Sequence, residues 1–195
     1  MNDHLTLLKH ISKYIQLTPS EQTEFLSILT ETLIEKKSYL IEPNIKVDQL
    51  YYVIQGCLKA YYLDEQGNKH ILQFAVEDWW ITDFNALYNG VSAQLYIEAI
   101  EDCHLLGIKS DVFEDLFLRI PKFERFFRIL YTKAFIALRK RVMSTLQKSN
   151  TERYLEFCAS YPNIEERVTN YHIANYLGIA AESLSRIRRE LKTLR

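Results

Sequence analysis

Residues 168–195 read VTNYHIANYLGIAAESLSRIRRELKTLR, a stretch whose spacing predicts two helices joined by a tight turn. Thr169 can cap the first helix, and Gly178 can take the left-handed conformation that ends it. Small and apolar residues occupy the fixed offsets that lock a second helix at a steep angle across the first. They are Ile173, Ala174, Leu177, Ile179, Leu184, Ile187 and Leu191. The segment therefore predicts a helix-turn-helix.

With those apolar residues inward, the second helix presents a polar and basic face. The segment holds 5 basic and 2 acidic residues, a local charge of +3. A helix of this kind reaches base edges and phosphates in the major groove. The residues that we expect to contact DNA are Glu182, Ser183, Ser185, Arg186, Arg188, Arg189 and Lys192. The alternative is an ordinary helical hairpin with a solvated charged face.

Charge is distributed unevenly along the 195 residues, although the net charge is only -1. Residues 1–121 hold 9 Lys and Arg against 18 Asp and Glu, whereas residues 122–195 hold 15 against 7. An acidic front half joined to a basic rear half indicates that the rear half meets a polyanion. Nucleic acid is the first candidate.

A long helix is predicted to open at Pro121 and to run to about Lys148. A helix of that length would extend roughly 40 Å, so part of its apolar stripe should pack against a second subunit. The expected seam is Phe127, Leu130, Ala134 and Ala137, which share one face at spacings of 3 and 4. We therefore expect a homodimer, with a helix wholly internal to a monomer as the alternative.

Ahead of this helix, residues 4–36 are predicted to be helical, with a capping box formed by Thr18 and Glu21. From about 38 to 108, short runs rich in Tyr, Val and Ile alternate with turn residues, which predicts an antiparallel sandwich, roll or barrel. The clearest hairpin pairs residues 57–63 with 69–75. Behind the long helix, Thr151 is expected to cap a shorter one.

Over nearly its whole length the chain resembles the CRP/FNR family of bacterial transcription regulators. The residues LYYVIQG at 50–56 look like the family's roll motif, and Asp64 to Gly67 looks like its hairpin turn. Thr151 with Arg153 is similar to the junction behind the family's dimerisation helix. The recognition helix matches the E-x-x-S-R pattern of the FNR branch at Glu182, Ser185 and Arg186.

The resemblance implies an α+β fold with three parts. Residues 1–120 would form an antiparallel β-roll (a cyclic-nucleotide-binding-like jelly roll) with flanking helices, 121–148 a dimerisation helix, and 149–195 a helix-turn-helix domain. The chain stops soon after the recognition helix, so we expect no C-terminal wing. The implied function is a cytoplasmic, homodimeric transcription regulator that binds a palindromic operator. The sequence does not indicate whether it activates or represses.

The resemblance also assigns roles on the DNA. Glu182 would accept a hydrogen bond from a cytosine amino group, and Arg186 would donate two to a guanine. Arg188, Arg189 and Lys192 would contact phosphates. RNA polymerase is a further candidate partner of a regulator of this kind.

The chain departs from the family where cyclic-AMP-binding members hold the phosphate with a Gly-Glu pair and an Arg-Ser pair. The corresponding stretches read WWITD at 79–83 and Ala93-Gln94, and no arginine precedes Arg119. Because a buried cyclic phosphate without a cationic partner is costly, we expect no response to cyclic AMP. The iron–sulfur branch uses an N-terminal cysteine cluster, whereas the first cysteine here is Cys57.

Aromatic residues stand where the nucleotide pocket would lie. They either fill it, which is the commoner use of aromatic clusters, or line a site for an unidentified apolar effector. The residues concerned are Trp79, Trp80, Phe84, Tyr88 and Leu138.

Two other function classes compete with a DNA-binding regulator. A cupin-like metal enzyme would need clustered ligands, but the 5 histidines form no H-x-H pair, and only His70 and His104 fall in strands where they could meet. We therefore expect no catalysis, no metal and no cofactor. The second rival is a β-roll module that binds a small molecule or a protein without DNA. No stretch approaches the roughly 20 apolar residues of a membrane span, so no membrane contact is expected.

Overall fold

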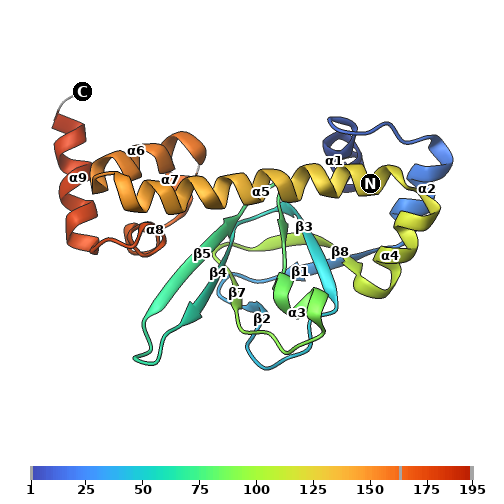
Figure 1. Cartoon of the computed structure of the whole chain (residues 1–195), viewed down its shortest axis with the longest axis horizontal. Coiled ribbons are helices and arrows are strands. Elements are labelled where there is room, and N and C mark those ends of the chain that lie inside the picture. The colour runs from blue at the N-terminus through green and yellow to red at the C-terminus, as the bar shows by residue number, and fades with distance from the viewer. Residues whose placement is uncertain (1, 163, 194–195) are drawn as a thin grey trace. The chain divides into compact units, whose positions relative to one another are not determined.

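The computed structural model describes residues 2–162 and 164–193, and it divides into two compact units. The first unit combines Met1–Ala60 with Phe74–Lys133, and the second combines Tyr61–Gln73 with Ala134–Arg195. The helices are α1 Asn2–Ser12, α2 Pro19–Ser27, α3 Phe84–Asn89, α4 Ser110–Arg119, α5 Lys122–Gln147, α6 Asn150–Ser160, α7 Ile164–Arg167, α8 Asn170–Leu177 and α9 Ala181–Thr193 (Figure 1). The strands are β1 Leu29–Ile34, β2 Tyr39–Ile41, β3 Gln49–Gln55, β4 Leu58–Leu63, β5 Lys69–Ala75, β6 Trp80–Ile81, β7 Tyr96–Ala99 and β8 Cys103–Lys109.

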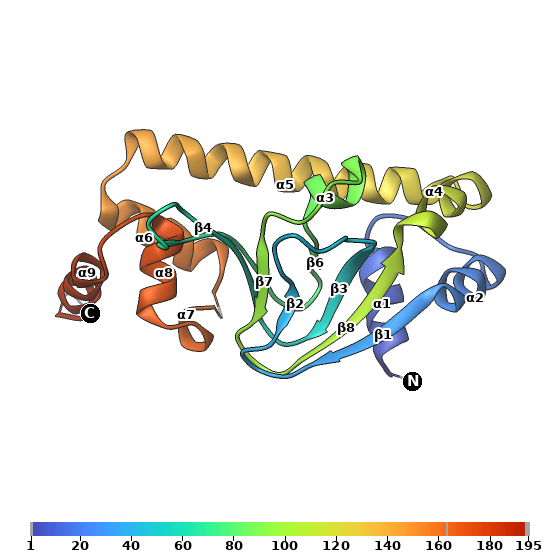
Figure 2. The ribbon, with the colours of Figure 1, turned by 90° about the horizontal axis from the view of Figure 1, so that it is seen from below.

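The strands form two four-stranded sheets, in the orders β1-β8-β3-β6 and β2-β7-β4-β5 (Figures 1 and 2). In the first sheet β8 pairs antiparallel with β1 on one side and with β3 on the other. In the second sheet β2 pairs antiparallel with β7. This arrangement confirms the expected antiparallel β-roll with flanking helices.

Two hydrophobic clusters hold the first unit together. The inner cluster lies among the strands and includes Val53, Leu58 and Ile97, none of which is exposed to solvent. The outer cluster joins α1, α4 and the start of α5 to the first sheet, through buried residues such as Tyr52 and Phe126. The helices are therefore fixed to the roll by burial of large aromatic and aliphatic side chains.

One prediction about the front of the chain is wrong. Residues 29–34 were expected within a helix that ran to residue 36, but they form β1, paired with β8 from Leu29 opposite Ile108 to Ile34 opposite Cys103. Thr30, Thr32 and Ile34 are β-branched and alternate along this segment, which favours a strand wherever a partner strand is at hand. Long-range pairing therefore overrides the helical spacing.

The predicted helix starts are confirmed with one correction. Thr18 and Glu21 form the expected capping box of α2, and α5 opens one residue after Pro121. At α6, Ser149 caps the helix in place of Thr151, because its hydroxyl accepts from the backbone N–H of Glu152. None of the helices in the described part of the chain is long and apolar enough to cross a membrane.

Gly56, between β3 and β4, offers a test of this packing. Its φ is +107°, and an added Cβ would lie 2.6 Å from Sγ of Cys103 and 2.7 Å from the carbonyl oxygen of Asp102. Gly56→Ala is expected to lower the free energy of unfolding by about 3 kcal/mol, since backbone strain and overpacking add. Chemical denaturation of the full chain measures the loss.

The matched control is Gly90→Ala, in the same unit. Gly90 also has positive φ, +65°, but its Cβ would meet open space. Only the left-handed strain remains there, so the expected loss is about 1 kcal/mol. Equal losses in the two variants would contradict the steric argument.

Candidate nucleic-acid interface

Local sequence fixes the turn between α8 and α9. The hydroxyl of Thr169 accepts from the backbone N–H of His172, which caps α8 at its start. Gly178 ends α8 in the left-handed conformation at φ 64° and ψ 40°, and Ile179 donates its backbone N–H back to the carbonyl of Ala174. The structure thus places the cap, the small residue and the turn glycine where the sequence predicts them. The buried residues of the two helices are Ile173, Ala174, Leu177, Leu184 and Ile187.

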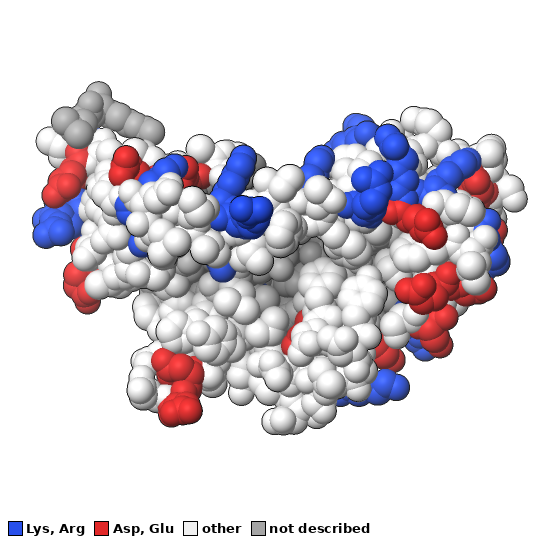
Figure 3. All heavy atoms as spheres, viewed as in Figure 1, with Lys and Arg blue, Asp and Glu red and all other residues white. Residues whose placement is uncertain are grey.

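The outward face of α9 carries most of the residues expected to contact DNA. Glu182, Ser185, Arg186, Arg189 and Lys192 are exposed on it. Figure 3 shows basic and acidic side chains next to each other on the surface that α9 forms. Ser183, in contrast, is half-buried. The exposed set has the mixture that base and phosphate contacts require, because it offers a carboxylate, a hydroxyl and three cations.

Arg188 differs from its neighbours, because it is engaged within the protein. Its guanidinium lies 2.9 Å from Oε1 of Glu165 and also donates to the side-chain oxygen of Asn170. The same carboxylate accepts from the hydroxyl of Tyr154, whose pKa is raised by burial, so that this hydroxyl stays protonated as a donor. Arg188 therefore anchors α9 to α7 and α8, a role that the sequence pattern did not indicate.

A concave patch runs along α9 beside the start of α8. Its lining offers amide, hydroxyl and cationic groups, which suits an anion of the size of a phosphate. The lining residues are Asn170, Ser185, Arg188, Arg189, Lys192 and Thr193.

The second unit also contains the tip of the hairpin formed by β4 and β5. Asn175 of α8 accepts the backbone N–H of Ile71 at 2.7 Å and donates to the carbonyl of Lys69. Arg141 of α5 donates to the carbonyl of Leu72 at 2.6 Å, and its guanidinium lies 4.7 Å from the ring centre of Tyr176. These contacts join the helix-turn-helix to the hairpin, and no local pattern in the sequence points to them.

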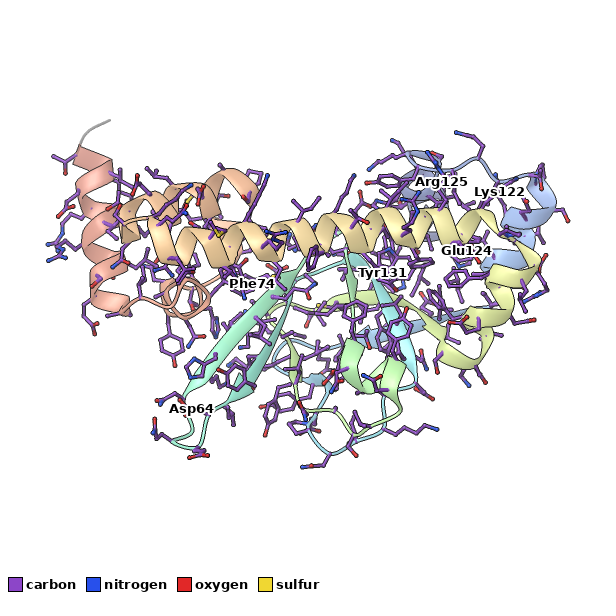
Figure 4. The ribbon with its side chains drawn as sticks, in the orientation of Figure 1. Asp64, Phe74, Lys122, Glu124, Arg125 and Tyr131 are labelled. Atoms are coloured by element: carbon purple, nitrogen blue, oxygen red, sulfur yellow. The ribbon has the colours of Figure 1, made fainter. Side chains whose placement is uncertain are left out.

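The turn of the hairpin is organised by Asp64, labelled in Figure 4. Its carboxylate accepts from the backbone N–H groups of Gln66 and Asn68 and lies 2.9 Å from Nε2 of His70. The hydrogen bond with His70, followed by those with Asn68, holds the pKa of Asp64 well below its usual range. Asp64 therefore remains ionised at neutral pH and fixes the turn.

The residues proposed for an effector pocket are mainly packing partners. Trp80 belongs to the outer cluster, Phe84 packs against that cluster, and Trp79 packs against the inner one. Tyr88 is half exposed, and its hydroxyl lies 2.8 Å from that of Tyr131. Leu138 lies in the second unit and is 51% exposed. The structure thus brings Trp79, Trp80 and Phe84 into contact with the cores, whereas Tyr88 contacts Phe84 and Tyr131.

Asp83 is buried at the end of the stretch 79–83, which the sequence resemblance aligns with a phosphate-binding stretch. One carboxylate oxygen accepts from the backbone N–H of Ala86 and caps α3. The other accepts from the backbone N–H groups of Gln94 and Leu95, at 2.9 and 3.2 Å. The amides that would be free to receive an anion are therefore hydrogen-bonded to a carboxylate of the chain itself.

The four residues expected to form the dimer seam differ in exposure. Phe127 is only 2% exposed because it belongs to the outer cluster, so it has no surface to offer a second subunit. Leu130 is half-buried against the same cluster, whereas Ala134 and Ala137 are exposed. The large apolar side chains that α5 exposes are instead Phe135, Ile136, Leu138, Val142, Met143 and Leu146.

His70 and His104 each pair with a different carboxylate, within different units. His70 lies in the second unit and pairs with Asp64, whereas His104 lies in the first unit with Nε2 2.6 Å from Oε1 of Glu31.

Comparison with known proteins shows what the chain is similar to. Residues 31–119 match the family model of the cyclic nucleotide-binding domain. The chain is 25% identical over 169 residues to the Anaerobic regulatory protein of Aggregatibacter actinomycetemcomitans, which covers 79% of this chain and 63% of that protein. It is 23% identical over 193 residues to the cAMP-activated global transcriptional regulator CRP of Pasteurella multocida, with 91% of each chain covered. It therefore spans less than two thirds of the anaerobic regulators that it matches.

Among solved structures, FixK2 from Bradyrhizobium japonicum superposes with a TM-score of 0.76 at 20% identity and 86% coverage of each chain. At this identity the similarity establishes a shared fold.

The role of Arg188 as an internal anchor can be measured. Arg188→Ala removes a hydrogen-bonded ion pair and leaves Glu165 without that cation, so the free energy of unfolding is expected to fall by about 1 kcal/mol. Arg189→Ala, one residue along on the exposed face, should change it by less than about 0.5 kcal/mol. Equal effects in denaturant titrations would show that Arg188 does not anchor the helix.

Proposed function

We propose that the chain is a CRP/FNR-type regulator that controls transcription by binding duplex DNA through α9. The match to the cyclic nucleotide-binding domain, the similarity to regulatory proteins and the shared fold support this proposal. The observation that carries the proposal is the exposed face of α9. Glu182, Ser185 and Arg186 stand there at the spacing of the FNR-branch recognition pattern, on a helix that a tight turn holds across α8.

In this proposal the residues of α9 divide by position. Glu182 and Arg186 lie in the first half of the helix, where a recognition helix meets base edges, and their side chains suit a cytosine amino group and a guanine edge. Arg189 and Lys192 line the concave patch and contact phosphates. Arg188 reaches a phosphate only from the side of its guanidinium that Glu165 does not occupy.

A second copy of the chain is the proposed occupant of the apolar face of α5. Phe135, Leu138, Val142 and Leu146 recur at spacings of 3 and 4 and are all at least half exposed. Such a stripe on a long helix can pair with its own copy about a two-fold axis. A dimer of this kind would present two copies of α9 to half-sites about one helical turn, roughly 34 Å, apart. We propose this set of residues as the dimer seam in place of the set that begins at Phe127.

A lack of response to cyclic AMP is also part of the proposal. Asp83 already satisfies the backbone N–H groups of Gln94 and Leu95, and a cyclic phosphate brought there would face this buried carboxylate. Bringing two anions together in a buried site is unfavourable. The interior of the roll is filled by the inner cluster, which leaves packing as the main role of the aromatic residues around it.

Selection of binding sites from random duplexes tests the DNA proposal. Arg186→Ala is expected to weaken binding to the selected site by about 1–3 kcal/mol and to relax preference at one base pair. Arg189→Ala is expected to weaken binding to all sequences alike and to reduce the salt dependence by about one phosphate contact. Cyclic AMP is expected to leave both affinities unchanged.

Three outcomes would contradict this assignment. No enrichment above background would favour the interaction module without DNA. An Arg186→Ala variant with unchanged site preference would remove Arg186 from the base contacts. Saturable binding of cyclic AMP, followed by calorimetry, would overturn the argument from Asp83.

The dimer seam has its own test in sedimentation analysis. Leu138→Glu places a charge in the middle of the exposed apolar face and is expected to raise the dimer dissociation constant by at least about tenfold. Ala137→Glu, one residue away on another face of α5, serves as the control and should leave the dimer intact. Dissociation by Ala137→Glu alone would favour a seam through Ala134 and Ala137.

A further inference from the structure

Three potential metal ligands converge within the first unit, whereas the residues assigned to DNA belong to the second. They are Asp3 of α1, Glu31 of β1 and His104 of β8, and one donor atom from each lies within 4.8 Å of the others. The three residues are far apart in the sequence, so the fold and not a local motif brings them together. No step of the proposed function uses them.

Strand register explains how two of the three meet. His104 stands directly opposite Leu33 in the antiparallel pair of β1 and β8. Directly opposite residues share a face of the sheet, and so do residues two apart on one strand. Glu31, two residues before Leu33, therefore lies diagonally across from His104 on the same face. Asp3, in the first turn of α1, completes the group.

The imidazole of His104 has a carboxylate neighbour but no hydrogen bond to it. Its Nε2 is shielded from solvent and lies 2.6 Å from Oε1 of Glu31, but it makes no hydrogen bond of normal geometry. A second carboxylate, that of Asp3, approaches the same place. With a neutral imidazole the three side chains carry a formal charge of -2, so the two carboxylates repel unless a cation lies between them.

We propose that Asp3, Glu31 and His104 bind a divalent transition-metal ion of the zinc type. One imidazole nitrogen and two carboxylate oxygens are ligands that Zn²⁺, Mn²⁺ and Fe²⁺ accept, whereas Ca²⁺ and Mg²⁺ are bound by oxygen ligands. Water would complete the coordination. Because the ligands come from α1, β1 and β8, the ion would fasten the first turn of α1 to the edge of the first sheet.

The experiment uses the full chain, treated with a chelator and freed of it by gel filtration. Equilibrium dialysis against Zn²⁺ is expected to give one bound ion per chain, with a dissociation constant in the micromolar range or below. Zn²⁺ should also raise the melting temperature, because it binds the folded state. Co²⁺ in place of Zn²⁺ should give a visible absorption band of a bound, low-symmetry ion.

Variants assign the ion to this site. His104→Gln and Glu31→Gln are each expected to weaken Zn²⁺ binding by at least about tenfold and to abolish the rise in melting temperature. The matched control is His70→Gln, which removes a histidine paired with a carboxylate in the other unit and should leave Zn²⁺ binding unchanged. If His104→Gln fails to fold, Asp3→Asn tests the same site, with the same weakening expected.

The proposal is overturned if the wild-type chain binds no Zn²⁺ at about millimolar concentration. It is equally overturned if binding survives in Glu31→Gln and Asp3→Asn, since the ion would then lie elsewhere, for instance at a cysteine. Neither result bears on DNA binding, which has its own assay, so failure of one proposal leaves the other intact.

Discussion

The fold depends on the pairing of β8 with two neighbours at once. This strand lies between β1 and β3, and its backbone carries the ladder that joins residues 29–34 to residues 49–55. The pairing turns residues 29–34 into a strand, and it brings the backbone around Gly56 so close to Cys103 that no side chain fits there. It also sets the face of the sheet on which α1, α4 and the start of α5 bury their aromatic residues. The positions of the flanking helices thus depend on the non-local pairing of β8 with β1 and β3.

Local rules in the sequence predict much of the second unit. A cap at Thr169, a left-handed glycine at 178 and the apolar offsets each act within one or two helical turns, so a single segment contains all the information they need. The exposed face of α9 follows from the same offsets. The hairpin around Asp64 is predicted for a similar reason, because its turn residues and its strands are contiguous.

Local rules do not predict features that depend on residues far apart in the sequence. Periodicity separates the faces of α5 but does not say which face meets the roll, and the seam chosen from it included Phe127, which the outer cluster buries. The positive charge of Arg188 is compatible both with a phosphate contact and with an internal ion pair. Only the position of Glu165 shows that Arg188 is an internal anchor. Residues 29–34 illustrate the same limit, since their helical spacing yields to pairing with β8, about 70 residues later in the chain. The residues around Asp83 and His104 gain their meaning only when separate segments meet.

The two hydrogen bonds of Asn175 have a consequence for solubility. β5 is an edge strand of its sheet, and an edge strand offers backbone groups to any extended chain that approaches. The amide of Asn175 accepts from Ile71 and donates to Lys69, as a neighbouring strand would. One side chain therefore blocks this part of the sheet edge from pairing with the strand of another polypeptide. A molecule in which α8 detached would expose these backbone groups and become prone to aggregation.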